Sequence, residues 1–190
     1  DTQRNHTATH LVHEALREVL GTHVEQKGSL VKAESLRFDF SHFSKVTDEE
    51  LAEVEAKVNA KILANHPLVE HRAISMEEAK ASGAMMLFGE KYGDEVRMIE
   101  FGSSKELCGG THAPATGVLG SFRITQETAV ASGIRRIEAI TGSAALQAMN
   151  TERNALQTIK SLLKAPANIE KAVEDLLTKH TILQKELDAV

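Results

Sequence analysis

Two pairs of residues, about 100 positions apart, place the strongest constraint on how this chain can fold. His6 and His10 are four positions apart, and Cys108 and His112 have the same spacing. On a helix, residues four apart lie on one face, so two imidazoles at this spacing point the same way. Imidazole nitrogens and a thiolate are ligands that Zn²⁺ accepts, usually four in a tetrahedron. The pattern predicts a His₃Cys zinc site and a fold that brings two distant segments together.

Length and composition suit one domain with an appendage. The chain has 190 residues, of which 42% are hydrophobic. That is enough for a domain of about 100–150 residues and a further segment. The net charge of −5 argues against broad, non-specific binding of nucleic acid but is compatible with a local basic patch.

Neither a membrane span nor a targeting segment is expected. The sequence has no apolar run of about 18 residues and no apolar stretch at its first residues. Its single cysteine allows no internal disulfide and suits a reducing compartment. We therefore expect a cytoplasmic location without membrane contact. The absence of an initiator Met indicates a piece of a longer chain.

The first pair of histidines falls on a predicted helix at residues 5–20. Asn5 suits the N-cap and Gly21 the C-terminal stop. Apolar residues recur at helical spacing and predict a buried stripe, whereas His6, His10, His13 and Arg17 share the opposite face. The helix alone is equally compatible with a solvated face that happens to carry histidine.

The remaining pattern predicts an α+β fold with an antiparallel or mixed sheet and packed helices. Thr47 with Glu50 and Ser75 with Glu78 form capping boxes that open two further helices. Residues 23–31 predict a hairpin with its turn at residues 27–29. Further strands are expected at residues 36–40, 68–74, 96–101, 118–125 and 134–140.

The C-terminal part predicts a helical extension. Residues 143–165 read as a connecting helix that Pro166 interrupts. In residues 166–190 apolar side chains repeat with alternating spacings of four and three, with His180 as the polar exception. This heptad seam predicts the start of a coiled coil, within one chain or between chains of a homo-oligomer. A single amphipathic helix packed on the domain is the alternative.

Spacing alone leaves the chemistry of the metal pair open. Four protein ligands are typical of a closed structural zinc site, whereas ligands from distant segments more often line a cleft. A His-Glu-x-x-His protease motif is absent, because Thr7 follows His6. A nucleophilic Cys108–His112 pair is a weaker alternative, because no orienting group follows it.

Six motifs occur in a fixed order along residues 5–142. They lie at His6–Leu11, Gln26–Leu30, Arg37–Phe40, Gly83–Tyr92, Cys108–His112 and Gly133–Glu138. Together they resemble the editing domain of alanyl-tRNA synthetases and the related freestanding trans-editing proteins. The heptads resemble the helical segment that follows this domain in the full synthetase. The resemblance thus divides the chain into an editing domain at 1–142, a connecting helix at 143–165 and the start of a helical segment at 166–190.

The resemblance implies an activity, a cofactor and site residues. The activity is hydrolysis of Ser-tRNA(Ala) and Gly-tRNA(Ala), whose acceptor end is the partner. The family's four zinc positions fall on His6, His10, Cys108 and His112, and its editing-site Thr and Gln fall on Thr9 and Gln26. ATP belongs only to the full-length synthetase, because this chain shows no aminoacylation motif.

Contacts with tRNA are predicted from residue type. Arg135 and Arg136 follow a glycine turn and are the best candidates, with ion pairs inside the domain as the equal alternative. Lys91 and Tyr92 suit the terminal adenosine. The backbone at Gly109 and Gly110 is expected to surround the tRNA end. Two rival functions stay open: a threonyl-type editing domain and a non-catalytic, zinc-stabilised RNA-binding module.

Overall fold

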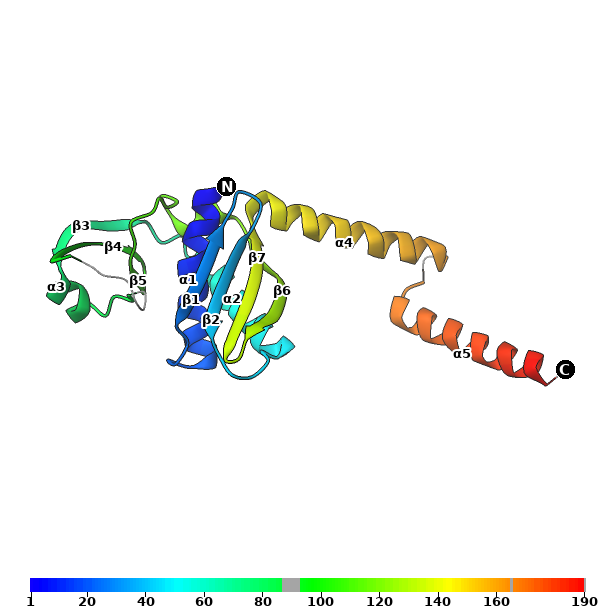
Figure 1. Ribbon diagram of the computed structural model, residues 1–190. Coiled ribbons are helices and arrows are strands. Elements are labelled where there is room, and N and C mark those ends of the chain that lie inside the picture. Colours follow the sequence, from blue (N-terminus) through cyan, green and yellow to red (C-terminus); the bar gives the residue numbers. More distant parts are fainter. Residues whose placement is uncertain (87–92, 165, 190) are drawn as a thin grey trace. The chain divides into compact units, whose positions relative to one another are not determined.

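The computed structural model describes residues 1–86, 93–164 and 166–189, and Figure 1 shows their helices and strands. The chain divides into two units, Asp1–Leu146 and Gln147–Val190. The first unit combines two antiparallel sheets with helices α1, α2 and α3. The α+β class predicted from the sequence is confirmed.

A four-stranded sheet forms the main layer of the first unit. Its order is β1-β2-β7-β6, and each neighbouring pair is antiparallel. The strands are β1 (Gln26–Val31), β2 (Leu36–Ser41), β6 (Phe122–Ala131) and β7 (Ile134–Thr141). Strand alternation puts Phe38 and Phe40 on one face, where both are fully buried, and Arg37 and Asp39 on the other.

Two helices cover the apolar face of this sheet. Helix α1 (Thr2–Leu20) packs on β1, β2 and β7, and α2 (Asp48–Leu63) packs on α1 and β6. The predicted capping box opens α2, because Thr47 and Glu50 exchange hydrogen bonds there. The main core includes Leu11, Val12, Ala15 and Leu16 of α1 and Val54, Val58 and Ile62 of α2.

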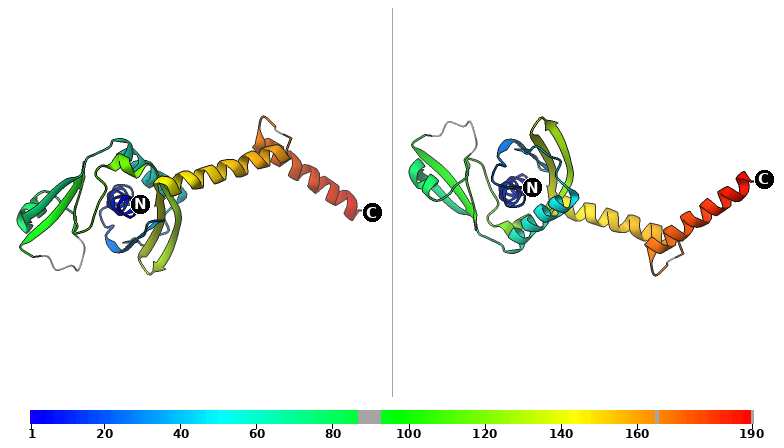
Figure 2. Two further views of the ribbon diagram at one scale, coloured as in Figure 1. Left: turned by 90° about the horizontal axis from the view of Figure 1, so that it is seen from above. Right: turned by 90° about the horizontal axis from the view of Figure 1, so that it is seen from below.

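A smaller sheet lies on the other side of α1. It has the order β3-β4-β5, formed by β3 (Val69–Ser75), β4 (Glu95–Phe101) and β5 (Ser104–Leu107). The second predicted capping box opens α3 (Met76–Ala81) beside it. Figure 2 shows α1 end-on between the two sheets. One face of α1 therefore packs on the four-stranded sheet, while another is free to meet β5.

The structure corrects two predicted strand boundaries. Residues 27–29 do not turn, because β1 runs through them and the chain reverses at residues 32–35. Gly28 marks a register shift in the strand instead, where an added Cβ would lie 3.4 Å from Asp39 Oδ2. The expected strand at 118–125 begins only at Phe122, because Thr116–Leu119 form the 3-10 helix η1. Leu119 is fully buried, and a short apolar run does not distinguish a strand from a helical turn.

The second unit contains most of α4 (Gly142–Leu162) and all of α5 (Ile169–Asp188). Asn168 caps α5, with its side-chain oxygen accepting from the backbone N–H of Lys171. No residue of α5 is buried, and Leu183 and Leu187 of the heptad seam are 63% and 70% exposed. The coiled coil stays a prediction. Among the described residues, no helix is both long and apolar enough to span a bilayer.

The sequence pattern predicted Asn5 as the N-cap of α1, and this prediction is wrong. The helix begins at Thr2, and Asn5 is 1% exposed inside it. Its Nδ2 donates to the carbonyls of Lys32 and Ala33 at 2.9 and 3.2 Å, and its Oδ1 accepts from Thr141 Oγ1 at 2.6 Å. The side chain therefore connects α1 to the β1–β2 turn and to the end of β7.

Replacing Asn5 tests this connecting role. Asn5→Ala should lower the free energy of unfolding by about 1–3 kcal/mol, because buried partners lose their hydrogen bonds. Asn5→Ser should be equally harmful, although serine is a good N-cap residue. Urea unfolding with a chelator present measures this, with the exposed Thr151→Ala as control. A stable Asn5→Ser variant would contradict the connecting role.

Candidate metal centre

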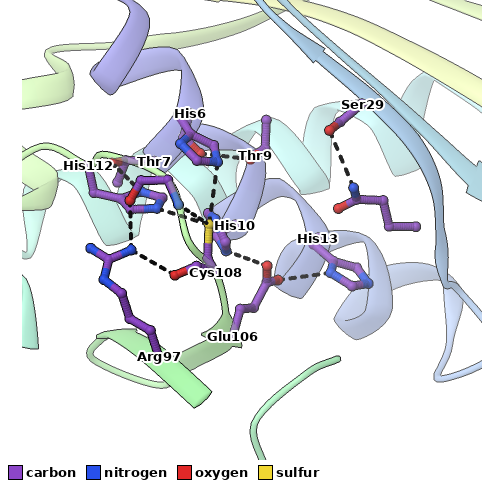
Figure 3. A network of polar contacts seen from close by, with 12 residues as sticks. His6, Thr7, Thr9, His10, His13, Ser29, Arg97, Glu106, Cys108 and His112 are labelled. Carbon is purple, nitrogen blue, oxygen red and sulfur yellow. Dashed lines mark hydrogen bonds and ion pairs between the residues drawn. The ribbon is translucent and has the colours of Figure 1, made fainter. Parts of the chain in front are cut away.

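The structure brings the two distant pairs of residues together. His6 and His10 lie on one face of α1, and Cys108 and His112 lie in the loop that follows β5 (Figure 3). One donor atom from each of the four lies within 4.8 Å of the others. Cys108 Sγ is 3.6 Å from His6 Nε2 and 3.3 Å from His112 Nε2. These separations suit four donors around one tetrahedral zinc ion.

The orientation of the three histidine rings tests whether the site fits a metal. His6 Nδ1 lies 3.0 Å from the carbonyl of Thr111, and His112 Nδ1 lies 3.2 Å from Thr7 Oγ1. His10 Nδ1 contacts the carboxylate of Glu106. A ring that donates Nδ1–H to an oxygen leaves Nε2 unprotonated, which is the usual arrangement of zinc-bound histidines. The residues present fit zinc.

The charges within this cluster are those that a metal would need. Burial raises the pKa of the Cys108 thiol, but its contacts with His10, His112 and His6 lower it to about 3, so the thiolate is present at neutral pH. Burial lowers the pKa of His10, but Glu106 and Cys108 raise it to about 10. Burial raises the pKa of Glu106, but His10 and His13 lower it to about 2. Without metal, His10 is protonated at neutral pH and faces two anions, the Cys108 thiolate and the Glu106 carboxylate, so these three groups keep a net negative charge for a cation to neutralise.

Three residues at the site were missed by the sequence analysis. Glu106 contacts His10, Thr7 Oγ1 accepts from the N–H of Ala113 at 3.0 Å, and Arg97 Nη1 donates to the carbonyls of Cys108 and Gly110, each at 2.7 Å. The alternation of side chains along a strand could have indicated one of these three residues, Glu106. Glu106 stands two positions before Cys108, and on an extended segment such residues face the same way.

The two glycines of the loop have different surroundings. The N–H of Gly110 donates to Cys108 Sγ at 3.4 Å, and a Cβ added at Gly110 would overlap the His6 ring. A Cβ at Gly109 would meet nothing within 4 Å among the described residues. Of the two positions predicted to surround the tRNA end, Gly109 has space beside it and Gly110 supports His6.

The predicted catalytic residues lie on neighbouring elements. Thr9 is 5% exposed on α1, and its Oγ1 donates to the carbonyl of His6 at 2.7 Å. Gln26 starts β1 and is partly exposed, and its Nε2 donates to Ser29 Oγ at 3.3 Å. Figure 3 shows Ser29 on β1, to one side of the histidine cluster. Lys91 and Tyr92 lie outside the described residues.

Both arginines predicted to contact tRNA have partners inside the domain. Arg135 Nε and Nη2 donate to the two carboxylate oxygens of Glu127 at 2.5 and 2.6 Å. Arg136 donates in the same way to Asp39 at 2.7 and 2.9 Å. The structure thus shows the ion pairs that the sequence analysis held as the alternative. An RNA phosphate would have to share these guanidinium groups with a carboxylate.

The two glycines provide a matched test of the site. Gly110→Ala should weaken zinc binding at least tenfold, because the added methyl displaces the His6 ring. Gly109→Ala should bind zinc as the unaltered chain does. Competition against a chromophoric chelator measures both affinities. Equal affinities for the two variants would contradict the close packing of Gly110 on His6.

Comparison with known proteins identifies the family of the chain. Residues 96–138 match the family described as the second additional domain of threonyl and alanyl tRNA synthetases. The chain is 55% identical to the alanine–tRNA ligase of Parabacteroides distasonis over 97% of its length, and 58% identical to that of Flavobacterium psychrophilum over 98%. These matches cover 21% of each relative, so the chain spans about a fifth of their length. It is therefore a domain of the alanyl-tRNA synthetase editing-region type, which is the family that its six motifs resemble.

Proposed function

We propose that this chain hydrolyses the ester bond of Ser-tRNA(Ala) and Gly-tRNA(Ala). The observation that carries the proposal is the meeting of His6, His10, Cys108 and His112 within 4.8 Å, next to Thr9, in a domain of this family. The relatives named alanine–tRNA ligases make tRNA(Ala) the preferred RNA partner over tRNA(Thr).

The chemistry of alanine selection explains why such a hydrolytic site is needed. A pocket that accepts alanine cannot sterically exclude glycine, and a hydroxyl adds little bulk to serine. One small group changes binding by only about 1–3 kcal/mol, so a second site must remove the wrong products. A deacylase that reads the serine hydroxyl meets that requirement for Ser-tRNA(Ala).

Some residues of the site would hold the zinc ion, and others would recognise the aminoacyl group. His6, His10, Cys108 and His112 would hold zinc, which when bound would fix the helix that carries Thr9 and the loop at Gly109, and would assist the ester carbonyl only by accepting a fifth ligand. The hydroxyl hydrogen of Thr9 is engaged by the carbonyl of His6, so Thr9 offers lone pairs that accept from a serine hydroxyl or an α-ammonium group. An aminoacyl ester is an activated acyl group, so positioning it beside water supplies much of the rate.

The loop and the sheet provide the proposed RNA contacts. The open space beside Gly109 suits the terminal nucleotide, with Lys91 as a further contact. Arg135 and Arg136 would present only the donors that their carboxylate partners leave free. Self-association through α5 belongs to the same proposal, because the apolar seam of that helix is exposed.

A comparison of three substrates tests the function. The chain should rapidly hydrolyse Ser-tRNA(Ala) while sparing Ala-tRNA(Ala) and Ser-tRNA(Thr), because the seryl substrate is recognised through both its hydroxyl and its tRNA. Release of labelled amino acid measures this. Loss of Ser-tRNA(Thr) alone would indicate threonyl-type editing. Binding of tRNA without hydrolysis of any substrate would indicate a non-catalytic module and refute the proposal.

Gln26→His should slow the deacylation of Ser-tRNA(Ala) at least tenfold, because the bulkier ring replaces an amide that recognises the aminoacyl group. Folding should be unchanged, since Gln26 is partly exposed. Ser29→Ala is the matched control, because it removes the hydrogen bond between Gln26 and Ser29 and leaves the amide in place. Circular dichroism verifies the fold. An equal loss of activity in Ser29→Ala would assign Gln26 a structural role.

A further inference from the structure

Behind the four-residue cluster lies a second, buried pair of residues. The carboxylate of Glu106 is 5% exposed and lies between two histidines of α1. One oxygen contacts His10 Nδ1, and the other is 2.8 Å from His13 Nδ1. Figure 3 shows Glu106 between His10 and His13, beside the cluster that contains Cys108. Glu106 and His13 are outside the set of four proposed ligands.

We propose that Glu106 and His13 are positioning residues of the metal centre: Glu106 orients His10 and balances the charge of the ion, and His13 holds Glu106. The inference rests on the zinc site of the proposed function. It assigns roles to two buried side chains that the four-ligand arrangement leaves unexplained.

The local structure places each of these residues in register with a ligand. His10 and His13 are three positions apart on α1 and thus share a face. Glu106 and Cys108 are two positions apart where β5 ends, so an extended backbone directs both toward α1. Helix α1 contributes two ligands and one supporting residue, and the segment of β5 and the loop after it contributes Glu106 beside Cys108 and His112. The support is therefore built from the same two segments as the cluster.

Charge balance gives Glu106 a specific task. A zinc ion bound by one thiolate and three neutral imidazoles has a net charge of +1. An uncompensated charge among buried groups is strongly unfavourable. Arg97, which holds the ligand loop, does not alter this sum, because it pairs with Glu70 at 2.6 Å. The carboxylate of Glu106 brings the total to zero.

Among the described residues, His13 forms its side-chain hydrogen bond with Glu106 and packs on an aromatic ring. Its side chain is 5% exposed, and its ring packs on Phe38 with centroids 5.4 Å apart. Among the described residues, Glu106 is the hydrogen-bond partner of Nδ1, and Nε2 has no partner. His13 therefore fixes the second oxygen of Glu106, and with it the direction in which the first oxygen meets His10.

Zinc affinities of single variants test the assignment. Glu106→Gln should bind zinc about 10–100-fold more weakly, the range expected when the outer partner of a ligand histidine is lost. His13→Leu should weaken binding about tenfold for the same reason. His13→Asn should retain most of the affinity, because its Nδ2 can donate to Glu106 in place of the imidazole Nδ1. Competition with a chromophoric chelator gives each affinity, and urea unfolding of the metal-free proteins verifies their folding.

Two controls separate this inference from the proposed zinc site. Glu100→Gln, on β4, alters a carboxylate near His71 and Lys105 and should leave zinc affinity unchanged. Cys108→Ala removes a ligand and should abolish tight binding. If the unaltered chain binds no zinc, the metal centre itself is refuted. If Cys108→Ala alone loses zinc, while Glu106→Gln and His13→Leu bind it normally, only the positioning roles are refuted.

The asparagine variant distinguishes positioning from packing. If His13→Asn binds zinc as poorly as His13→Leu, the ring of His13 is needed for its shape and its positioning role is refuted. If Glu106→Gln does not fold, the comparison of Leu with Asn at position 13 decides the question. Cobalt(II) in place of zinc adds a spectroscopic measure, because its absorption bands should shift in His13→Leu and return toward normal in His13→Asn.

Discussion

The position of α1 between the two sheets is the constraint on which the rest of the structure depends. Its apolar stripe packs on the four-stranded sheet, which leaves a second face to meet β5 and the loop after it. That second face carries His6, His10 and His13, and two of these rings are almost fully buried. A helix with one face in water could not present these groups in so protected a setting. Burial strengthens every charge interaction there, which is why the pKa values of Cys108 and Glu106 depart so far from their usual ranges.

Short sequence motifs predicted those features of the fold that depend only on neighbouring residues. Both capping boxes open helices where they were expected, because each is complete within four residues. Asn5 shows the limit of such reasoning. Its residue type suits a cap, but a tertiary demand placed it inside the helix, where it bonds to the β1–β2 turn and to Thr141. Gly28 is a second case, because it lies at a register shift inside β1 and not in a turn. Neither role could be identified before the sheet register was known.

In the candidate site, too, some features follow from local sequence and others depend on tertiary packing. The sequence predicted the meeting of the four donor groups. Each pair has a spacing of four residues, which places its two side chains close together, and the residue types of both pairs suit one zinc ion. Glu106 and Thr7 went unnoticed because their roles depend on which nitrogen of each histidine faces outward. That choice is made by the packing of α1 against β5. For Arg135 and Arg136 the sequence left two roles open, contact with tRNA and ion pairs within the domain. Their charge suggested RNA, yet each guanidinium forms a two-pronged pair with a carboxylate on the sheet.

Each of the three histidines is oriented by an oxygen from a different source. The loop orients His6 through its own carbonyl at Thr111, α1 orients His112 through Thr7, and β5 orients His10 through Glu106. Helix, strand and loop therefore hold one another's ligands in place. A shift of any one segment would misalign a ring that belongs to another segment. Metal binding at such a site is coupled to the docking of α1 against the smaller sheet, because the ligand set exists only when that docking is complete. The same coupling would keep Thr9 and the space at Gly109 in a constant relation, as recognition of a small aminoacyl group requires.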